Sequence, residues 1–408
     1  MRVDNILEEE KKKISLSSEE VKKLYETANN FIKLLKKGGL KAYIGGSLAK
    51  GTLIRKDEKQ DIDIFVVFDY SEEMEKLEKF LNKSFYKNVK KIHGSRDYFQ
   101  IEFPEAILEI IPVVKNVNPE IAENVTDVSL SHVVYVKNIL EKKPLLADEI
   151  RLAKSFCKAQ KCYGAESYIK GFSGYSLEVL VIYFGGFVEF LKGIKKKRVI
   201  DPVKSFKNEN EILREINSSK LNSPIILVDP TYKYRNITAG LNQETFERFL
   251  KSSGGFLKNP SIEFFEEREI LREDLLKMAV ENKAKLFELE ISTDRQEGDV
   301  AGSKMRKFFD FVVSNLEKKQ QEILLKEFLY SGKGKKAKGF ILVREKKEIE
   351  VRGPPIGLDE AVKKFKKAHK KVFLKKSYLW FKEKLDDREI ILGLKKFEKE
   401  MGVKFKLK

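Results

Sequence analysis

Apolar residues near the start of the chain recur at helical spacing. Steps of three or four residues separate Val21, Leu24, Tyr25, Ala28, Ile32 and Leu35. Ser17 and Glu20 stand just before this pattern at the spacing of a capping box, and Gly38-Gly39 follows it. We therefore expect an amphipathic helix that begins after Ser17 and ends before Gly38.

Shorter apolar segments follow, and they alternate in the manner of strands. "KAYIGGS" (41–47) and "QDIDIFVVFD" (60–69) predict two strands joined by a turn and a polar loop. Residues 71–86 return to helical spacing, and "DYFQIEF" (97–103) with "AILEIIPVV" (106–114) predicts a hairpin. The order helix, strand, strand, helix, hairpin indicates a small mixed α/β domain that ends near residue 140.

The rest of the chain changes character twice. Residues 145–193 are helical and rich in aromatic side chains, and "SPIILVDPTYKYRNITAGL" (223–241) predicts one buried strand and a turn before a helix that ends near Leu250. "KSSGGFLKNP" (251–260) is typical of a linker. Beyond it the pattern predicts a long helix, a strand at 285–292, a helix at 303–319, a strand at 339–345, a turn at "RGPP" (352–355) and a helix at 358–371. We expect an α+β multidomain protein with boundaries 1–140, 141–256 and 257–408.

Composition supports folded domains and gives the last region a distinct charge. The 408 residues are 42% hydrophobic and 11% aromatic, enough for two or three globular cores. Residues 331–408 contain 25 Lys and Arg against 11 Asp and Glu, a net charge of +14 out of +18 for the whole chain. A polyanion such as nucleic acid is the expected partner of this region. A lysine-rich solvated surface of the kind found in heat-adapted proteins is the alternative.

Neither a membrane span nor a disulfide framework is expected. The longest apolar run, "GYSLEVLVIYFGGFVEFL" (174–191), contains Glu178 and Glu189 and is typical of a buried helix. Cys157 and Cys162 have no partner pair at zinc-ligand spacing and are expected to be buried bystanders. With a polar N-terminal segment, these features indicate a cytoplasmic protein without membrane partners.

The candidate chemistry lies in "YIGGSLAKGTLIRKDEKQDIDIFVVFD" (43–69). On a strand Asp61 and Asp63 point to one face, while Ile62 and Ile64 point to the core. Two adjacent carboxylates repel one another, and a hard divalent cation such as Mg²⁺ relieves that repulsion while it also binds substrate phosphates. Gly45 and Gly46 allow backbone to approach a phosphate closely. Ser47 adds a hydroxyl and Lys50 a positive charge.

A third carboxylate is expected in a two-metal site for phosphoryl transfer. Glu109 interrupts the apolar strand "AILEIIPVV", where a buried acid requires a partner or a metal. Glu102 and Glu105 are the competing candidates, but they flank a turn at Pro104 and are expected to face water.

With these motifs the chain resembles the archaeal (class I) CCA-adding enzymes, which are tRNA nucleotidyltransferases of the polymerase β-type superfamily. "YGAESYIKGFSGYSLEVLVIYFGGF", "VDPTYKYRN" and "RGPP" also match that family in order and spacing. The resemblance implies a mixed-sheet nucleotidyltransferase head at 1–140, a helical central domain at 141–256 that completes the nucleotide pocket, and an α+β RNA-binding region at 257–408. It also implies template-independent addition of CCA to the 3′ end of tRNA from CTP and ATP, with Mg²⁺ as cofactor, and it favours a homodimer.

The resemblance also assigns residues. Asp61, Asp63 and Glu109 match the catalytic metal ligands, and Arg235 and Asn236 match the arginine and its neighbour that support the base pocket. The expected nucleotide contacts are Gly46, Ser47, Lys50, His132, Lys154, Tyr163 and Arg235. The chain departs from the family at Glu109, usually aspartate, and at Lys50, usually arginine. Lysine cannot make the bidentate phosphate contact of arginine.

Without the family resemblance, some of the residues in this part of the chain can also be given a purely structural role. His132 has either a ligand role or a buried, hydrogen-bonded one. Lys154 and Tyr163 are nine residues apart, so one continuous helix would turn them to roughly opposite faces. We therefore expect Tyr163 at the end of the helix. Phe172, Tyr175, Tyr183 and Phe184 are expected to be core residues, with a role as base-stacking platforms as the alternative.

Four other functions share part of this pattern. A poly(A) polymerase or an oligoadenylate synthetase has the same metal site, and a small-substrate nucleotidyltransferase has no use for the basic C-terminal region. A non-catalytic RNA-binding protein has no need of an intact acid set.

Overall fold

A computed structural model describes residues 3–85, 88–93, 96–115, 125–268, 270–344, 346, 348–384 and 386–408. The chain forms two compact units, Met1–Arg268 and Glu269–Lys408. The first unit contains a small mixed sheet and a helical region, and the second contains two antiparallel sheets. The predicted α+β class is confirmed.

The sheet of the first unit has five strands in the order β1-β2-β5-β4-β3. Their bounds are Lys41–Ile44 for β1, Gln60–Phe68 for β2, Val89–Ile92 for β3, Tyr98–Glu102 for β4 and Ala106–Val114 for β5. Strand β2 is antiparallel to β1 but parallel to β5, and β4 and β5 form the expected hairpin. The parallel pair at the centre brings together segments about 45 residues apart in the sequence.

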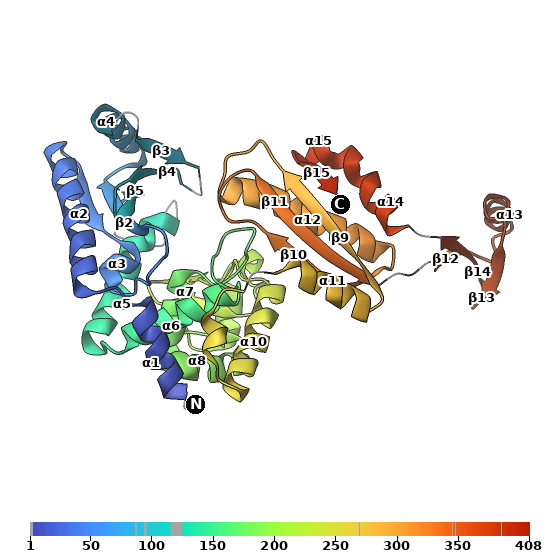
Figure 1. Cartoon of the computed structure of the whole chain (residues 1–408), viewed down its shortest axis with the longest axis horizontal. Helices are drawn as coiled ribbons and strands as arrows, with labels where there is room; N and C mark the ends of the chain where they lie inside the picture. The colour runs from blue at the N-terminus through green and yellow to red at the C-terminus, as the bar shows by residue number, and fades with distance from the viewer. Residues whose placement is uncertain are drawn as a thin grey trace. The chain divides into compact units, whose positions relative to one another are not determined.

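One face of this sheet is covered by helices α2 (Ser18–Lys37) and α4 (Glu75–Phe85), the latter preceded by the 3₁₀ turn η1 (Ser71–Met74) (Figure 1). Ile62, Ile64, Leu108 and Ile110 point into this core and are fully buried. Because side chains alternate along a strand, the intervening polar residues lie on the opposite face. The capping box predicted for α2 is confirmed.

The segment after β1 differs from the prediction. Residues Gly46–Lys50 form a short helix, α3, where a simple turn was expected. The helix ends at Gly51, whose φ of 70° lies in the left-handed region that glycine adopts readily. Ser47 and Lys50 are thereby presented from a helical turn.

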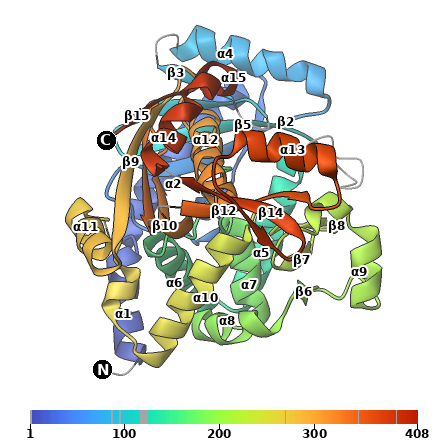
Figure 2. The same cartoon turned by 90° about the vertical axis from the view of Figure 1, so that its right-hand side faces the viewer.

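Figure 2 shows the helices of the helical region. This region packs around aromatic side chains. Its main helices are α5 (Ser129–Lys142), α6 (Leu146–Ala159), α7 (Gly174–Phe184), α8 (Phe187–Gly193), α9 (Glu209–Glu215) and α10 (Gln243–Lys258), with 3₁₀ turns η3 (Val125–Val128), η4 (Ile194–Lys196), η5 (Ser218–Lys220) and η6 (Ile262–Phe265). The largest fully buried rings are Phe156, Phe172, Phe187, Phe190, Phe249 and Phe256. Cys157 and Cys162 are buried with free thiols, as expected.

Helix α1 (Val3–Ile14) was not predicted from the sequence. Its apolar residues Ile6, Leu7 and Ile14 are buried in the helical region, against α6 and η6. Helix α1 therefore completes a core that is otherwise built from Ile54 and from residues between 135 and 265.

Two predictions for residues 223–260 are wrong. The segment 223–241 contains two antiparallel strands, β7 (Ile226–Asp229) and β8 (Tyr232–Asn236), and β7 also pairs with β6 (Val199–Ile200). The expected linker at 251–260 is largely helical, because α10 continues through Gly254-Gly255 to Lys258. Burial of Phe249 and Phe256 on one face of α10 outweighs the low helix propensity of the two glycines.

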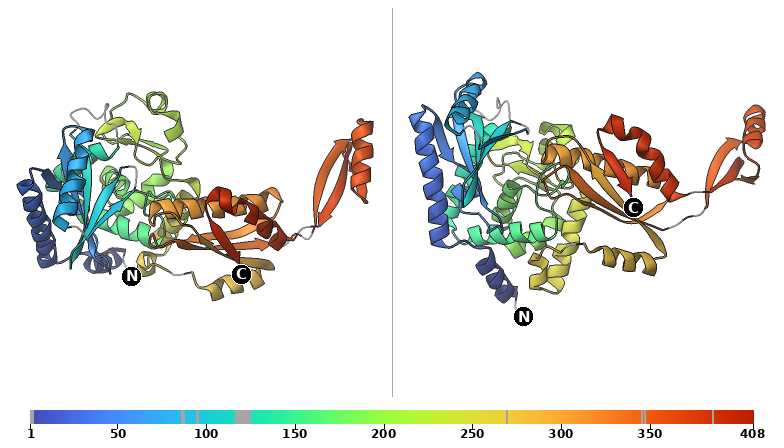
Figure 3. Two further views of the ribbon diagram at one scale, coloured as in Figure 1. Left: turned by 90° about the horizontal axis from the view of Figure 1, so that it is seen from above. Right: turned by 45° about the horizontal axis from the view of Figure 1, so that its top comes forward.

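The second unit contains a four-stranded sheet in the order β10-β11-β9-β15 and a three-stranded sheet in the order β12-β14-β13. The strands are β9 (Ala284–Ser292), β10 (Glu322–Leu329), β11 (Lys336–Arg344), β12 (Glu348–Pro355), β13 (Val372–Lys375), β14 (Tyr378–Lys384) and β15 (Lys404–Leu407). The helices are α11 (Arg272–Glu281), α12 (Asp299–Lys318), α13 (Asp359–Ala368), α14 (Asp387–Leu392) and α15 (Glu398–Met401), with the 3₁₀ turn η7 (Gly393–Phe397). Figure 3 shows α13 against the three-stranded sheet.

Several details of the second unit were not predicted. "RGPP" (352–355) lies in strand β12, at a register shift between Arg352 and Pro355, and not in a free turn. The expected long helix after residue 260 is the ten-residue α11, and the lysine-rich helix ends at Ala368. None of the described helices is both long enough and apolar enough to span a membrane.

The continuity of α10 gives a first prediction. Phe256→Ala should reduce the free energy of unfolding by about 3–5 kcal/mol, because it removes a fully buried ring from the aromatic core. Lys251→Ala, at an exposed position one turn earlier, should change it by less than about 0.5 kcal/mol. Urea unfolding followed by circular dichroism measures both. Similar small effects for the two variants would indicate a linker and not a packed helix.

Candidate active site

Three acidic side chains share the sheet face that points away from α2 and α4. Asp61 and Asp63 lie two residues apart on β2, and the parallel register places Glu109 of β5 directly beside Asp63. Neighbouring strands are about 4.8 Å apart, so these carboxylates interact strongly. The competitors Glu102 and Glu105 are exposed, and Glu102 pairs with Lys59. Glu109 is therefore the acid that the fold brings to the aspartate pair.

The ionisation of these acids reflects their crowding. Burial and the charges of Asp63 and Asp61 raise the pKa of Glu109 to about 7. Burial also raises the pKa of Asp63, although the positive charge of Lys50 opposes this. A divalent cation relieves both effects, since it supplies positive charge to oxygen ligands. The residue types and their placement fit such an ion.

Protein groups bind two of the acids in the structure. The Lys56 ammonium is hydrogen-bonded to Asp61, and Gln100 donates to Glu109 Oε1 over 2.9 Å. In the described part of the chain, no three acidic, His or Cys side chains already converge as a metal cage. Lys56 therefore supplies part of the positive charge that the acids require, and its side chain must move if a cation replaces it.

Gly46 determines where the Asp63 carboxylate can lie. Its φ is 57°, and an added Cβ would stand 1.6 Å from Asp63 Oδ2. At the preceding residue, a Cβ on Gly45 would stand 2.1 Å from the Phe65 ring. The two glycines thus let α3, with half-buried Ser47, approach β2 more closely than any other residue would allow.

Lys50 and Lys154 meet at a buried carboxylate that the sequence interpretation missed. Glu178 of α7 is fully buried, and its Oε2 accepts a hydrogen bond from Lys50 over 2.6 Å. Its Oε1 accepts from Lys154 over 2.8 Å and from the hydroxyl of Thr52 over 2.7 Å. Lys154 is 3% exposed, so the lysine is buried beside this carboxylate.

Tyr163 lies beyond the end of α6, as predicted, in an isolated bridge with Phe172. An added Cβ on Gly174 would stand 2.9 Å from Tyr163 Oη and 3.9 Å from Lys154 Cε. The two side chains therefore approach the same glycine, despite their separation of nine residues. Burial raises the pKa of the Tyr163 phenol, so it stays protonated.

A second buried carboxylate, Asp229, organises His132 and Arg235. Its Oδ2 lies 3.1 Å from His132 Nε2 and 3.1 Å from Arg235 Nη1, and its Oδ1 accepts from Tyr175 over 3.1 Å. The His132 ring stacks on Tyr175 with centroids 3.8 Å apart. His132 is thus buried and hydrogen-bonded, while Tyr175, expected only to fill the core, belongs to the cluster.

Charge explains the protonation of this cluster. Burial alone would raise the pKa of Asp229, but the hydrogen bond from His132 and the charge of Arg235 lower it to about 2. Burial lowers the pKa of His132, although Asp229 opposes this. The cluster therefore contains an ionised aspartate, a charged arginine and a neutral histidine at pH 7.

Asn236 supports the strand pair beneath this cluster. Its Oδ1 accepts from the backbone of Leu227 over 2.9 Å and of Thr238 over 3.0 Å, and its Nδ2 donates to the carbonyl of Lys220 over 2.8 Å. The Asn236 side chain holds β7 and β8 together. It therefore supports the neighbouring Arg235 indirectly, through the strand pair.

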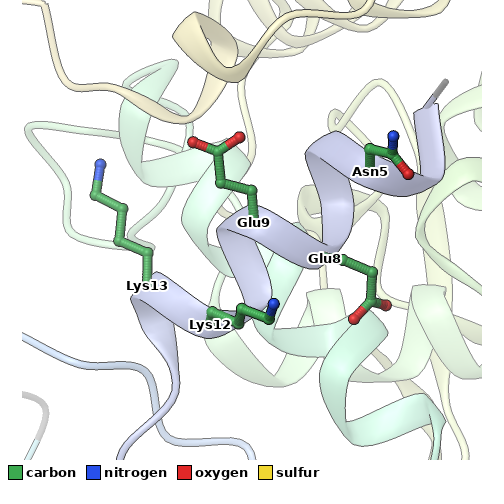
Figure 4. Close-up of a pocket in the computed structure, with 5 residues that line it drawn as sticks. All are labelled: Asn5, Glu8, Glu9, Lys12 and Lys13. Atoms are coloured by element: carbon green, nitrogen blue, oxygen red, sulfur yellow. The ribbon is translucent and has the colours of Figure 1, made fainter. Parts of the chain in front are cut away.

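The three acids of β2 and β5 lie near the lysines bound to Glu178 and near the cluster around Asp229. The charge of Lys50 acts on both Asp63 and His132, and Lys50 Nζ lies 5.9 Å from the Tyr175 ring centroid. The pocket in Figure 4 is a different one, on α1. It is lined by Asn5, Glu8, Glu9, Lys12 and Lys13, none of which was predicted for the site.

Known families match both parts of the first unit. A nucleotidyltransferase domain matches residues 25–127, and the second domain of tRNA nucleotidyltransferases matches 148–266. With the acid set on β2 and β5, this defines the protein as a nucleotidyltransferase. The chain is 33% identical to a CCA-adding enzyme of Nanoarchaeum equitans over 82% of this chain and 81% of the relative. It therefore belongs to the CCA-adding enzyme family, which confirms the resemblance found in the sequence.

Other relatives agree with this assignment. A CCA-adding enzyme of Methanocaldococcus jannaschii is 30% identical over 92% of this chain and 86% of the relative. A solved cytoplasmic RNA terminal U-transferase has a TM-score of 0.52 at 13% identity and covers 66% of this chain and 99% of its own. A solved poly(U) polymerase bound to MgATP has a TM-score of 0.51 at 12% identity, covering 65% of this chain and 98% of its own. At such low identity these two structures support the fold alone.

Gly46 gives a prediction about metal binding. Gly46→Ala should weaken Mn²⁺ binding at least about tenfold, because the new methyl group displaces the Asp63 carboxylate. Gly51→Ala is the matched control, since its φ is also positive but an added Cβ meets nothing within 4 Å. Both variants should lose about 1 kcal/mol of stability through backbone strain. Electron paramagnetic resonance titration with Mn²⁺ tests the difference, and equal affinity for the two variants would contradict this role of Gly46.

Asp229 gives a prediction about pH. At pH 7, Asp229→Asn should be about 3 kcal/mol less stable than the wild type, because it takes the buried counterion away from the half-buried Arg235 charge. The folded-state pKa lies below that of an unfolded aspartate, so this contribution is complete above pH 4 and is lost as the pH falls toward 2. The difference between wild type and variant should therefore shrink by about 2 kcal/mol over that range.

Denaturant unfolding at a series of pH values measures this difference. Asp57→Asn, at an exposed position, controls for the loss of one formal negative charge. A difference between wild type and Asp229→Asn that stays constant from pH 7 to pH 2 would show that the Asp229 charge does not stabilise the cluster.

Proposed function

We propose that the protein adds cytidine, cytidine and adenosine to the 3′ end of tRNA without a template, using CTP and ATP. The observation that carries this proposal is the parallel register of β2 and β5, which sets Glu109 beside Asp63 with Asp61 on the same face. Membership of the CCA-adding enzyme family supplies the choice of substrates.

Asp61, Asp63 and Glu109 would hold two Mg²⁺ ions in this reaction. When bound, these ions acidify the 3′-hydroxyl of the RNA and stabilise the leaving pyrophosphate. Glu109 contributes one methylene more reach than an aspartate. Its raised pKa falls once a cation compensates the neighbouring charges.

The remaining side chains bind and orient the nucleotide. Lys50 and Lys154 place positive charge beside the triphosphate, and Gly46 and Ser47 bring α3 close to it. His132 and Tyr163 add contacts to the nucleotide, and Arg235, held by Asp229 and supported by Asn236, contributes to the base pocket.

The three regions divide this work. Residues 1–140 carry the metal ligands, 141–256 complete the pocket, and the basic residues 257–408 bind the duplex arm of tRNA through its backbone and 2′-hydroxyls. The enzyme acts in the cytoplasm, and a homodimer is its proposed assembly.

Incubation of the protein with tRNA lacking its 3′ CCA, Mg²⁺ and each nucleotide tests this function. CTP alone should add two residues, ATP alone should add none, and both together should complete CCA; UTP and GTP should not be incorporated. Asp63→Asn should reduce incorporation at least about a thousandfold, because an amide is a poor Mg²⁺ ligand, while tRNA binding by gel shift is retained. Repeated incorporation of ATP alone would indicate a poly(A) polymerase instead.

A further inference from the structure

Glu178 occupies an unusual position for a charged residue. It lies in the middle of the apolar helix α7, is fully inaccessible to solvent, and bonds to lysines from two other elements, Lys50 of α3 and Lys154 of α6. A buried carboxylate is tolerated only when its charge is compensated. Two ammonium groups therefore surround one carboxylate. Lys50, Lys154 and Glu178 together keep a net positive charge.

The two lysines differ in the hydrogen-bonding capacity that remains to them. The three N–H groups of Lys154 have three acceptors: the Thr52 carbonyl at 3.2 Å, the Thr52 hydroxyl at 2.9 Å and Glu178 Oε1 at 2.8 Å. Among the described residues, Lys50 Nζ donates only to Glu178 Oε2. Two N–H groups of Lys50 thus remain for another ligand, whereas Lys154 must release a protein bond to contact one.

The lysines also depend on Glu178 for their charge. Burial and the nearby charge of Lys50 lower the pKa of Lys154, and Glu178 opposes both effects. In turn the two lysines hold the pKa of Glu178 at about 2, although burial alone would raise it. Without this carboxylate, two buried ammonium groups would repel one another, and one would lose its proton or move toward solvent.

The position of Glu178 on α7 extends its influence. Tyr175 lies one turn earlier on the same helix face and donates to Asp229, which binds His132 and Arg235. One face of α7 therefore fixes the lysines through Glu178 and the Asp229 cluster through Tyr175.

We propose that Glu178 is a positioning residue for triphosphate binding: it holds Lys50 and Lys154 together, with Lys50 oriented as the primary phosphate donor. The inference rests on the proposed function only in that the ligand of the two lysines is a triphosphate. The opposite view treats Glu178 as a fixed negative charge that repels phosphate. The two views differ in sign, because removal of a repelling charge strengthens phosphate binding, whereas removal of a positioning carboxylate weakens it.

Isothermal titration of the full chain with tripolyphosphate, and with CTP in the presence of Mg²⁺, tests this proposal without tRNA. Glu178→Gln keeps the shape of the side chain but removes its charge, and it should raise the Kd of both ligands about tenfold or more. Glu178→Asp keeps the charge but is too short to reach both lysines, so it should raise the Kd by a smaller factor. Glu189→Gln, an exposed acid on the next helix, is the matched control and should bind as the wild type does.

Thr52→Val supplies a second variant if Glu178→Gln does not fold, since it removes the hydroxyl that joins Lys154 to Glu178. It should raise the Kd of tripolyphosphate about threefold in a protein with wild-type circular dichroism. A Kd that falls or stays within twofold of the wild-type value in folded Glu178→Gln, or in folded Thr52→Val if the former does not fold, overturns the proposal.

These results are distinguishable from failure of the proposed function. A protein that binds tripolyphosphate in a Glu178-dependent manner but does not extend tRNA with CTP and ATP would refute the function and leave the positioning role intact. A protein that completes CCA but shows no dependence on Glu178 would refute the positioning role alone.

Discussion

Carboxylates on two adjacent strands repel one another, and the first unit is built so that they cannot separate. The parallel pairing of β2 with β5 holds Asp63 beside Glu109, and the core under α2 and α4 fixes which face they occupy. A shift of one residue in either strand would turn its acids into that core, so the apolar residues that alternate with them enforce the register. The fold thus holds unfavourable charge at the position where we propose that a cation and a nucleotide bind.

Besides the acid set, the first unit contains two buried carboxylates that lie beside positively charged side chains. Glu178 compensates Lys50 and Lys154, and Asp229 compensates Arg235. A substrate phosphate needs positive charge, but uncompensated ammonium and guanidinium groups are costly to bury. Buried counterions resolve this conflict, because they keep the cations charged and ordered before a ligand arrives. Helix α7 is central to this arrangement although its sequence is almost entirely apolar.

The sequence predicted correctly the features that depend on interactions between neighbouring residues. The capping box of α2 and the alternation that orients Asp61, Asp63 and Glu109 depend on neighbouring residues only. Glu178 and Asp229 were missed because each has one essential partner that is distant in the chain; Lys50 precedes Glu178 by 128 residues and His132 precedes Asp229 by 97. A signal for Glu178 existed, since an acid within an apolar helix requires a buried partner, which is the argument that identified Glu109.

The errors in secondary structure have a related cause. The Gly254-Gly255 pair indicates a break on local propensity, yet tertiary packing of the aromatic rings maintains α10. Strand β8 pairs with β7 through an irregular register that the sequence pattern does not show, and "RGPP" joins a sheet whose other strands follow it in sequence.

The packing of α1 against α6 and η6 affects the order in which the chain can fold during synthesis. Its apolar residues have their partners about 140 and 250 residues later, so they remain exposed on the ribosome until almost the whole first unit has been translated. The core of the helical region can therefore be completed only late, when α1 packs against η6. Fragments that begin at the central region would present the surface normally covered by α1 to solvent, and self-association is the expected result.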